Sequence, residues 1–205
     1  MAENFVNVTE GSGKKLHTFN KTIGANDVHD EIVLLGENYL ASYTVSTPTP
    51  SSTATANSHL LQVMAGASLK VRIRRIEVYQ FAVATTASLM QLQLRRLTTA
   101  GTGGGALTPN PLDPSDSASG ATAMALPTVK GTEGVVLAEG VVYLMQTVAA
   151  SAQLSEPIQV WDFDRPRSKP LVIAAGTTNG ICIKNTGGIA GSSVSVNVWL
   201  DESNF

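Results

Sequence analysis

The sequence is short of charge, of aromatic side chains and of cysteine. Charged residues make up 15% of its 205 residues, well below the roughly 25% of an ordinary soluble domain. The net charge at neutral pH is −2, so the chain as a whole is not attracted to nucleic acid or to an anionic membrane. The composition therefore predicts no specific nucleic-acid partner and no membrane partner.

Aromatic residues are 5% of the chain, which argues against a sugar-binding cleft or platform. The one cysteine, Cys182, stands in the apolar run Ile181–Ile183, so no intrachain disulfide can form and a buried thiol is expected. No apolar run approaches the roughly 18 residues of a membrane span. The first residues also lack the basic and apolar regions of a secretory signal, and we expect a protein made in a cytoplasm without secretion.

Motifs for catalysis and for cofactor binding are missing as well. No serine lies in Gly-x-Ser-x-Gly, the nucleophile turn of α/β-hydrolases. The triplet Gly103–Gly105 precedes Ala106-Leu107 instead of the Lys-Ser/Thr of a phosphate loop. The three histidines, His17, His29 and His59, have no second ligand at metal spacing and are expected at the surface. We predict no enzyme, no catalytic residues, no cofactor and no metal site.

Two acidic pairs leave a calcium site open, because Ca²⁺ takes several oxygen ligands. Asp162 and Asp164 lie two residues apart at the end of an expected strand, and Asp113 and Asp116 lie in an expected loop. Neither pair has the spacing of an EF-hand loop. The preferred interpretations are Asp113 as the cap of a short helical turn and Asp162 or Asp164 paired with the arginines that follow them.

Two stretches of alternating apolar and polar residues are the clearest positive signal in the sequence, Leu69–Val78 and Met90–Leu97. Alternation with a period of two is typical of a strand with one buried face. Each stretch shifts its phase at an Arg-Arg pair, which predicts a β-bulge there. Five of the seven arginines fall in these stretches: Arg72, Arg74, Arg75, Arg95 and Arg96.

These five arginines are the candidate interface residues. The two stretches are close in sequence, so we expect that the two strands can pair and gather the arginines on one face. The net charge and the missing nucleic-acid motifs argue against a nucleic-acid target. We predict instead that Arg72, Arg74 and Arg95 meet carboxylates of a neighbouring subunit.

Nine or ten short strands are expected, and no pattern of helical period extends beyond a few turns. Such a count predicts an all-β fold, an antiparallel β-sandwich that is jelly-roll-like. We expect an extended N-terminal arm over residues 1–30 and a single sandwich domain over 31–205. The glycine- and proline-rich stretch 98–131 is predicted to be a long interfacial loop.

Two short segments are predicted to be turns. Glu139-Gly140 separates the expected strands 135–137 and 141–148 and is interpreted as a tight turn. Asn179-Gly180 lies between the expected strands 171–173 and 181–183, where an Asn-Gly pair is a hairpin signal.

Three parts of the chain carry a family resemblance. A polar arm leads into Glu31–Gly36, and the turns are rich in Gly, Ser, Thr and Ala, as in Thr98–Gly103. The chain ends with Lys169–Ile173 and Gly180–Asn185 followed by an alternating valine strand. In this overall pattern of composition and strands, the sequence resembles small β-sandwich structural proteins of tailed bacteriophages. The resemblance spans nearly the whole chain and contains no signature motif.

The resemblance implies a virion protein made in the host cytoplasm, either a capsid decoration (cement) protein or a minor head or fibre-base protein. It implies self-association, commonly as a homotrimer, and contacts with other virion proteins such as the major capsid protein, made through the arm and the 98–131 loop. One alternative is an adhesin or a carbohydrate- or receptor-binding module of a fibre, which would need exposed aromatics. The other is a β-sandwich enzyme, which would need clustered polar groups with shifted pKa values in a pocket.

Overall fold

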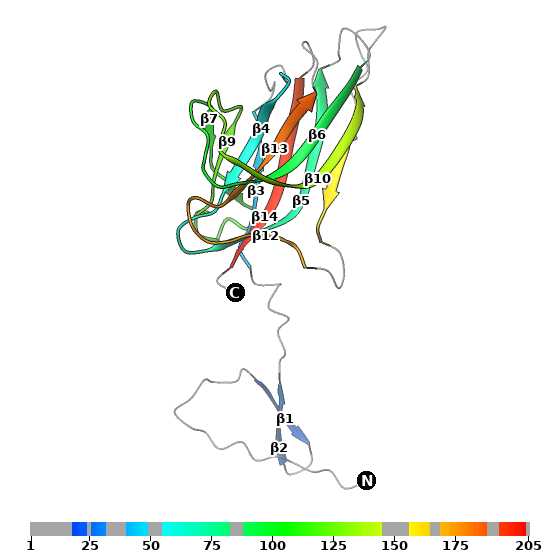
Figure 1. The fold of residues 1–205 in the computed structure, drawn as a ribbon. Coiled ribbons are helices and arrows are strands. Elements are labelled where there is room, and N and C mark those ends of the chain that lie inside the picture. Colours follow the sequence, from blue (N-terminus) through cyan, green and yellow to red (C-terminus); the bar gives the residue numbers. More distant parts are fainter. Residues whose placement is uncertain are drawn as a thin grey trace. The chain divides into compact units, whose positions relative to one another are not determined.

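The computed structural model describes residues 18–23, 26–31, 40–48, 55–82, 88–144, 156–164, 169–187 and 193–203. The chain divides into two compact units, Met1–Tyr39 and Leu40–Phe205, so the boundary falls later than residue 30. In the first unit, β1 (Thr18–Ile23) and β2 (Asn26–Glu31) pair in an antiparallel ladder (Figure 1). This part of the expected arm therefore has a sheet of its own, and the expected strand at 32–35 lies outside the described residues.

The second unit is an antiparallel β-sandwich, as predicted, and its described residues contain no helix (Figure 1). The described residues of this unit form twelve strands in place of the nine or ten expected, because the stretch 98–131 contributes three. The strands are β3 (Ser42–Ser46), β4 (Ser58–Met64), β5 (Lys70–Ala82), β6 (Ser88–Leu97), β7 (Gly105–Leu107), β8 (Asn110–Pro111), β9 (Thr122–Ala125), β10 (Glu133–Leu144), β11 (Gln159–Asp162), β12 (Leu171–Ile173), β13 (Gly180–Gly187) and β14 (Ser193–Ser203).

The strand order identifies the type of sandwich. One sheet, called the β6 sheet here, has the order β10-β6-β13-β4-β9-β7. The other, called the β5 sheet, has the order β11-β5-β14-β3-β8, and β12 also pairs with β5. Without the short strands β7, β8, β9 and β12, four strands in the order β10-β6-β13-β4 face four in the order β11-β5-β14-β3. Eight strands divided between two sheets in this way form a jelly roll.

The stretch 98–131 is an insertion folded onto the domain, which corrects its prediction as an irregular loop. Its strands β9 and β7 extend the β6 sheet beyond β4, and β8 extends the β5 sheet beyond β3. The buried carboxylate of Glu202 on β14 holds the segment before β9, because it accepts hydrogen bonds from Ser119 Oγ (2.7 Å), Gly120 N (3.0 Å) and Ala121 N (2.7 Å). The three strands of the insertion therefore extend the sandwich on its β3/β4 side and not on its β10/β11 side.

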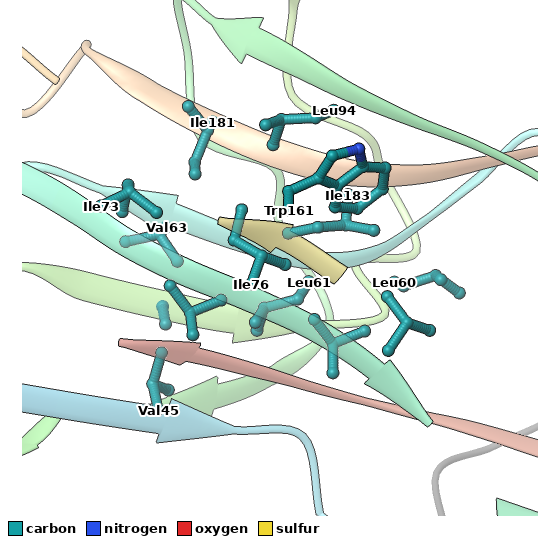
Figure 2. Packing of buried hydrophobic residues seen from close by; sticks show 14 of the residues in the cluster. Val45, Leu60, Leu61, Val63, Ile73, Ile76, Leu94, Trp161, Ile181 and Ile183 are labelled. Carbon is teal, nitrogen blue, oxygen red and sulfur yellow. The ribbon is translucent and has the colours of Figure 1, made fainter. Parts of the chain in front are cut away.

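The core lies between the two sheets and consists of the inward side chains of nearly every long strand (Figure 2). Ile73 and Ile76 of β5 face Ile181 and Ile183 of β13, and all four are fully buried. Trp161 of β11 belongs to the same cluster and is 8% exposed. Burying a side chain of this size stabilises the fold by roughly 1.5–3 kcal/mol, so the alternating apolar residues of the sequence are the main source of stability.

Neither predicted turn is a hairpin. Glu139 and Gly140 lie inside β10, where they pair with Gln93 and Leu92 of β6. A Cβ atom at position 140 would lie 2.5 Å from the side-chain oxygen of Gln159 on β11, so the glycine leaves room for the end of this flexible side chain. The segment that ends at Asn179-Gly180 does contain a turn, in which Asn179 N donates to the backbone oxygen of Gly176 (2.9 Å). It leads from β12, which pairs with β5, to β13 in the opposite sheet, so it crosses the sandwich and forms no hairpin.

Candidate interaction surface

The two arginine-rich strands do not pair, because β5 and β6 belong to opposite sheets. The bulge predicted in the first strand is present: Trp199 of β14 pairs with Arg75 and Leu200 pairs with Ile73, which leaves Arg74 as the extra residue. At the second Arg-Arg pair the ladder between β6 and β10 is irregular on either side of Arg95, but the extra residues lie on β10. The strand β6 itself pairs with β13 without interruption from Leu97 to Leu92. The five arginines therefore do not gather into one basic stripe.

Arg74, the extra residue of the bulge in β5, forms ion pairs with two carboxylates. Its backbone oxygen accepts a hydrogen bond from Phe163 N (2.9 Å), just past the end of β11. Its guanidinium bonds the buried carboxylate of Asp201 on β14 and also Asp164 Oδ1 (2.7 Å). Burial by itself lowers the pKa of Arg74, but these two carboxylates outweigh it and raise that pKa above its ordinary value. Both carboxylates that bind Arg74 thus come from its own chain.

Arg95 takes part in a cluster around Glu133, the first residue of β10. The Glu133 carboxylate contacts Lys184 Nζ (2.8 Å), Arg95 Nη1 (3.1 Å), His59 Nε2 (3.1 Å) and Lys130 Nζ (3.6 Å). Burial alone would raise the pKa of Glu133, but the bonds from Lys184 and His59 and the positive charges lower it to about 2. The cluster joins β4, β6, β10 and β13 across the outer face of the β6 sheet.

His59 is fully buried, which corrects its prediction as a surface residue. The backbone N–H of Gly101 donates to Gln62 Oε1 (2.8 Å), and this bond turns the amide nitrogen of Gln62 towards His59 Nδ1 (2.9 Å). Neutral His59 therefore carries its proton on Nε2 and donates it to Glu133. Burial lowers the pKa of His59 below its ordinary value, which favours this neutral form. No sequence signal links Gly101 and Glu133 to the β4 residues His59 and Gln62, because they come from three separate segments of the chain.

The other three arginines are also positioned by their own chain. Arg75 Nη2 lies 2.5 Å from Glu77 Oε1. Arg96 donates to the backbone oxygen of Val172 (2.6 Å) on β12 in the facing sheet, and burial lowers the pKa of Arg96. Arg72 is half-buried on β5, between Val172 of β12 and Asp201 of β14 in the ladder. A subunit contact for the five arginines stays a prediction, but the described partners of Arg74, Arg75, Arg95 and Arg96 are intrachain.

Both acidic pairs serve local structure. Asp162 Oδ1 accepts a hydrogen bond from Asp164 N (2.9 Å), and Asp164 binds Arg74. The arginines that were expected to pair with them, at positions 165 and 167, lie outside the described residues.

The second acidic pair lies in a short turn, and the side chain of Asp113 caps this turn as expected. Asp113 Oδ1 accepts bonds from Ser115 N (2.9 Å) and Ser115 Oγ (2.7 Å), and these bonds lower the pKa of Asp113. Asp116 N donates to the backbone oxygen of Asp113 (3.0 Å), which closes the turn. Within the described ranges, no three His, Cys, Asp or Glu residues are grouped so that they could hold a metal ion. Of the other two histidines, His17 lies outside the described residues, and the side chain of His29 is not described.

Cys182 is a buried free thiol, as predicted. It packs with Met64 and Leu97 in a small apolar cluster separate from the main core. Burial raises its pKa to about 12, so the thiol stays protonated and unreactive in the folded protein. In the described part of the chain, no helix is long and apolar enough to cross a membrane.

Six exposed apolar side chains gather on β10 and the adjacent β6, and we call this group the apolar edge surface. Tyr143 and Leu89 are directly paired across the two strands, and each is 60% exposed; Val141, one pair further along on the same face, is 62% exposed. The whole group is Leu89, Val135, Val136, Leu137, Val141 and Tyr143. The sequence held a signal for it, because 135–144 is apolar at almost every position whereas a half-buried strand alternates.

Comparison of the chain with protein-family models, with curated proteins and with solved structures gives no match. The functional argument therefore rests on the fold and on the surfaces described above.

Proposed function

We propose that this protein is a structural component of a tailed-bacteriophage virion, a capsid decoration or minor capsid protein. The sequence texture supports the proposal, and so does the jelly-roll order of the strands, an architecture used by viral capsid domains. The same architecture also serves lectins and cupins, so the fold by itself does not decide between functions. The surface of the domain has to supply the decisive argument.

The observation that carries the proposal is the apolar edge surface. Its six side chains are between 36% and 67% exposed. Exposed apolar side chains that gather in one place on a soluble protein often mark a functional contact. A protein whose task is assembly needs such a surface, and we assign this one to association with copies of the same chain.

The proposed contacts differ from those first expected of a loop at 98–131. That insertion is already bound to β3, β4 and Glu202 within the chain, so ordering it does not depend on a partner. The unit Met1–Tyr39 keeps its proposed role as the part that reaches other virion proteins, such as the major capsid protein. In this scheme the sandwich supplies a rigid body, β10 and β6 supply self-association, and the N-terminal unit supplies attachment.

Cosedimentation with phage heads tests the proposal. The genes that flank the coding sequence identify the heads to use, and heads purified before and after expansion are incubated with the full chain. We expect saturable binding to expanded heads at a fixed ratio to the major capsid protein. If the chain sediments with neither form of head and with no tail preparation from the same phage, the virion role is wrong.

A further inference from the structure

The four edges of the two sheets are not equally protected. An exposed strand edge offers unpaired N–H and C=O groups, and proteins usually shorten it, bulge it or place Lys or Pro on it. Three of the four edges are short here: β7 has three residues, β8 has two and β11 has four. The fourth edge is β10, which has 12 residues and contains neither lysine nor proline.

The second half of β10 is also regular. Register shifts against β6 fall between Glu133 and Val136 and between Val136 and Ala138. From Ala138 to Leu144 the ladder with β6 continues without interruption, and among the described residues no strand pairs with the other edge of this segment. The bulges that would hinder pairing with another strand therefore stop at Ala138, and seven residues stay open for pairing.

We infer that the segment Ala138–Leu144 pairs antiparallel with the same segment of a second copy of this chain. The seven-residue segment is centred on Val141, so full overlap places Val141 opposite Val141 of the second copy. Glu139 then faces Tyr143 of the second copy, and the only charge in the segment does not meet its like. Two β6 sheets become one continuous sheet across a two-fold axis.

The second copy fits this edge because the apolar surface is present on both sides of the axis. Val141 and Tyr143 lie on the edge strand, and Leu89 lies directly behind Tyr143 on β6. Pairing across the axis places Val141 and Tyr143 of one copy beside those of the other, so part of their exposed apolar surface is covered in the dimer. The ladder bonds along Ala138–Leu144 add to this contact. The unit formed is a dimer, which departs from the trimer that the family resemblance implies.

The inference rests on the proposed function only in assigning self-association to this surface, and two variants of the full chain test it. Val141→Lys puts like charges opposite each other at the axis, whereas Val129→Lys is a matched control, because Val129 is also 62% exposed but lies in the insertion. Sedimentation velocity over a range of concentrations should show a dimer for the wild type and for Val129→Lys. For Val141→Lys we expect a dissociation constant at least about tenfold higher.

A cysteine at the axis tests the pairing itself. Directly opposed residues of an antiparallel pair have Cα atoms about 4.5–5.5 Å apart, which a disulfide can span. Val141→Cys should therefore form a linked dimer on mild oxidation, and Val129→Cys should not. A wild type that remains monomeric or forms trimers, a dimer that Val141→Lys leaves intact, or a dimer without the Val141→Cys link would each overturn the inference. Binding of monomeric Val141→Lys to expanded heads would leave the virion role standing.

Discussion

Replacing Glu133 by glutamine should destabilise the protein in a way that depends on pH. Glutamine keeps the size of the side chain and can still accept the hydrogen bond from His59. It offers no negative charge to Lys184, Arg95 or Lys130, which lie 2.8 to 3.6 Å from the carboxylate. The variant therefore leaves three cations without their shared counter-ion on the outer face of the β6 sheet.

The size of the effect follows from the pKa of Glu133. Its fall from 4.5 to about 2 corresponds to roughly 3 kcal/mol at about 1.4 kcal/mol per pKa unit. That is an upper bound, because the Glu133 side chain is 18% exposed and solvent screens part of the attraction. We expect the free energy of unfolding at pH 7 to fall by about 2 kcal/mol. A carboxyl with a lowered pKa stabilises the fold above its unfolded value, so the difference should be full above about pH 5 and shrink as the pH falls towards 2.

Urea unfolding followed by tryptophan fluorescence measures the effect, because Trp161 lies in the core. Wild type and Glu133→Gln are compared at pH 7, 5, 4 and 3, with Glu139→Gln as control. Glu139 is exposed on the same strand and bonds only Gln93 Nε2 (2.5 Å) among its described contacts, so its loss should cost less than about 0.5 kcal/mol. Equal losses in the two variants, or a Glu133→Gln loss that does not change with pH, would refute the assignment of Glu133 as the centre of the cluster.

Two further predictions concern the insertion and two glycines. Glu202→Gln should lower the free energy of unfolding by about 2 kcal/mol and speed hydrogen exchange at Ala121, since one amide oxygen cannot replace a carboxylate with three donors; unchanged exchange there would contradict the role of Glu202. Gly140→Ala should cost only about 1 kcal/mol, and less when combined with Gln159→Ala, because the obstructing atom ends a flexible side chain. Gly180→Ala should cost more, about 3 kcal/mol, because its Cβ would lie 2.7 Å from a backbone oxygen of β4. Equal losses at the two glycines in urea unfolding would show that backbone approach does not set the cost.

Much of the fold could be predicted from the sequence, because alternation reports which face of a strand is buried. The same signal located the bulge at Arg74, where the apolar residues Ile73 and Ile76 keep facing the core on either side of it. It failed at Gly140, because the sequence does not distinguish a glycine that makes room for a neighbouring side chain from a glycine in a turn. It also failed at Arg96, which β6 turns towards the facing sheet without a bulge.

The candidate site was less predictable, because it depends on which strands become neighbours. His59 and Glu133 are 74 positions apart and meet only after β4, β13, β6 and β10 have assembled. The jelly-roll strand order decides that meeting, and no local pattern encodes it. The apolar edge surface is different, because the high apolar content of 135–144 is visible in the sequence. Only the strand order, however, shows that this segment is the edge of a sheet.

The structure favours one of two explanations of the proposed self-association, an interface made by the arginines or an interface made by the apolar edge of β10. An interface built on arginines and carboxylates of a neighbour would weaken as salt rises, because exposed ion pairs are screened. The charged groups of Arg74, Arg75 and Arg95 are bound to carboxylates of their own chain, whereas the exposed side chains of β10 are apolar apart from Glu139. Association through β10 should therefore be nearly unchanged when sodium chloride is raised from about 0.05 to about 0.5 M, although the screening length falls from roughly 14 to roughly 4 Å. It should be stronger in sulfate. At about 0.5 M sodium chloride, exposed charges are screened within roughly 4–5 Å. A dimer that dissociates there would show that the arginines, and not β10, make the interface.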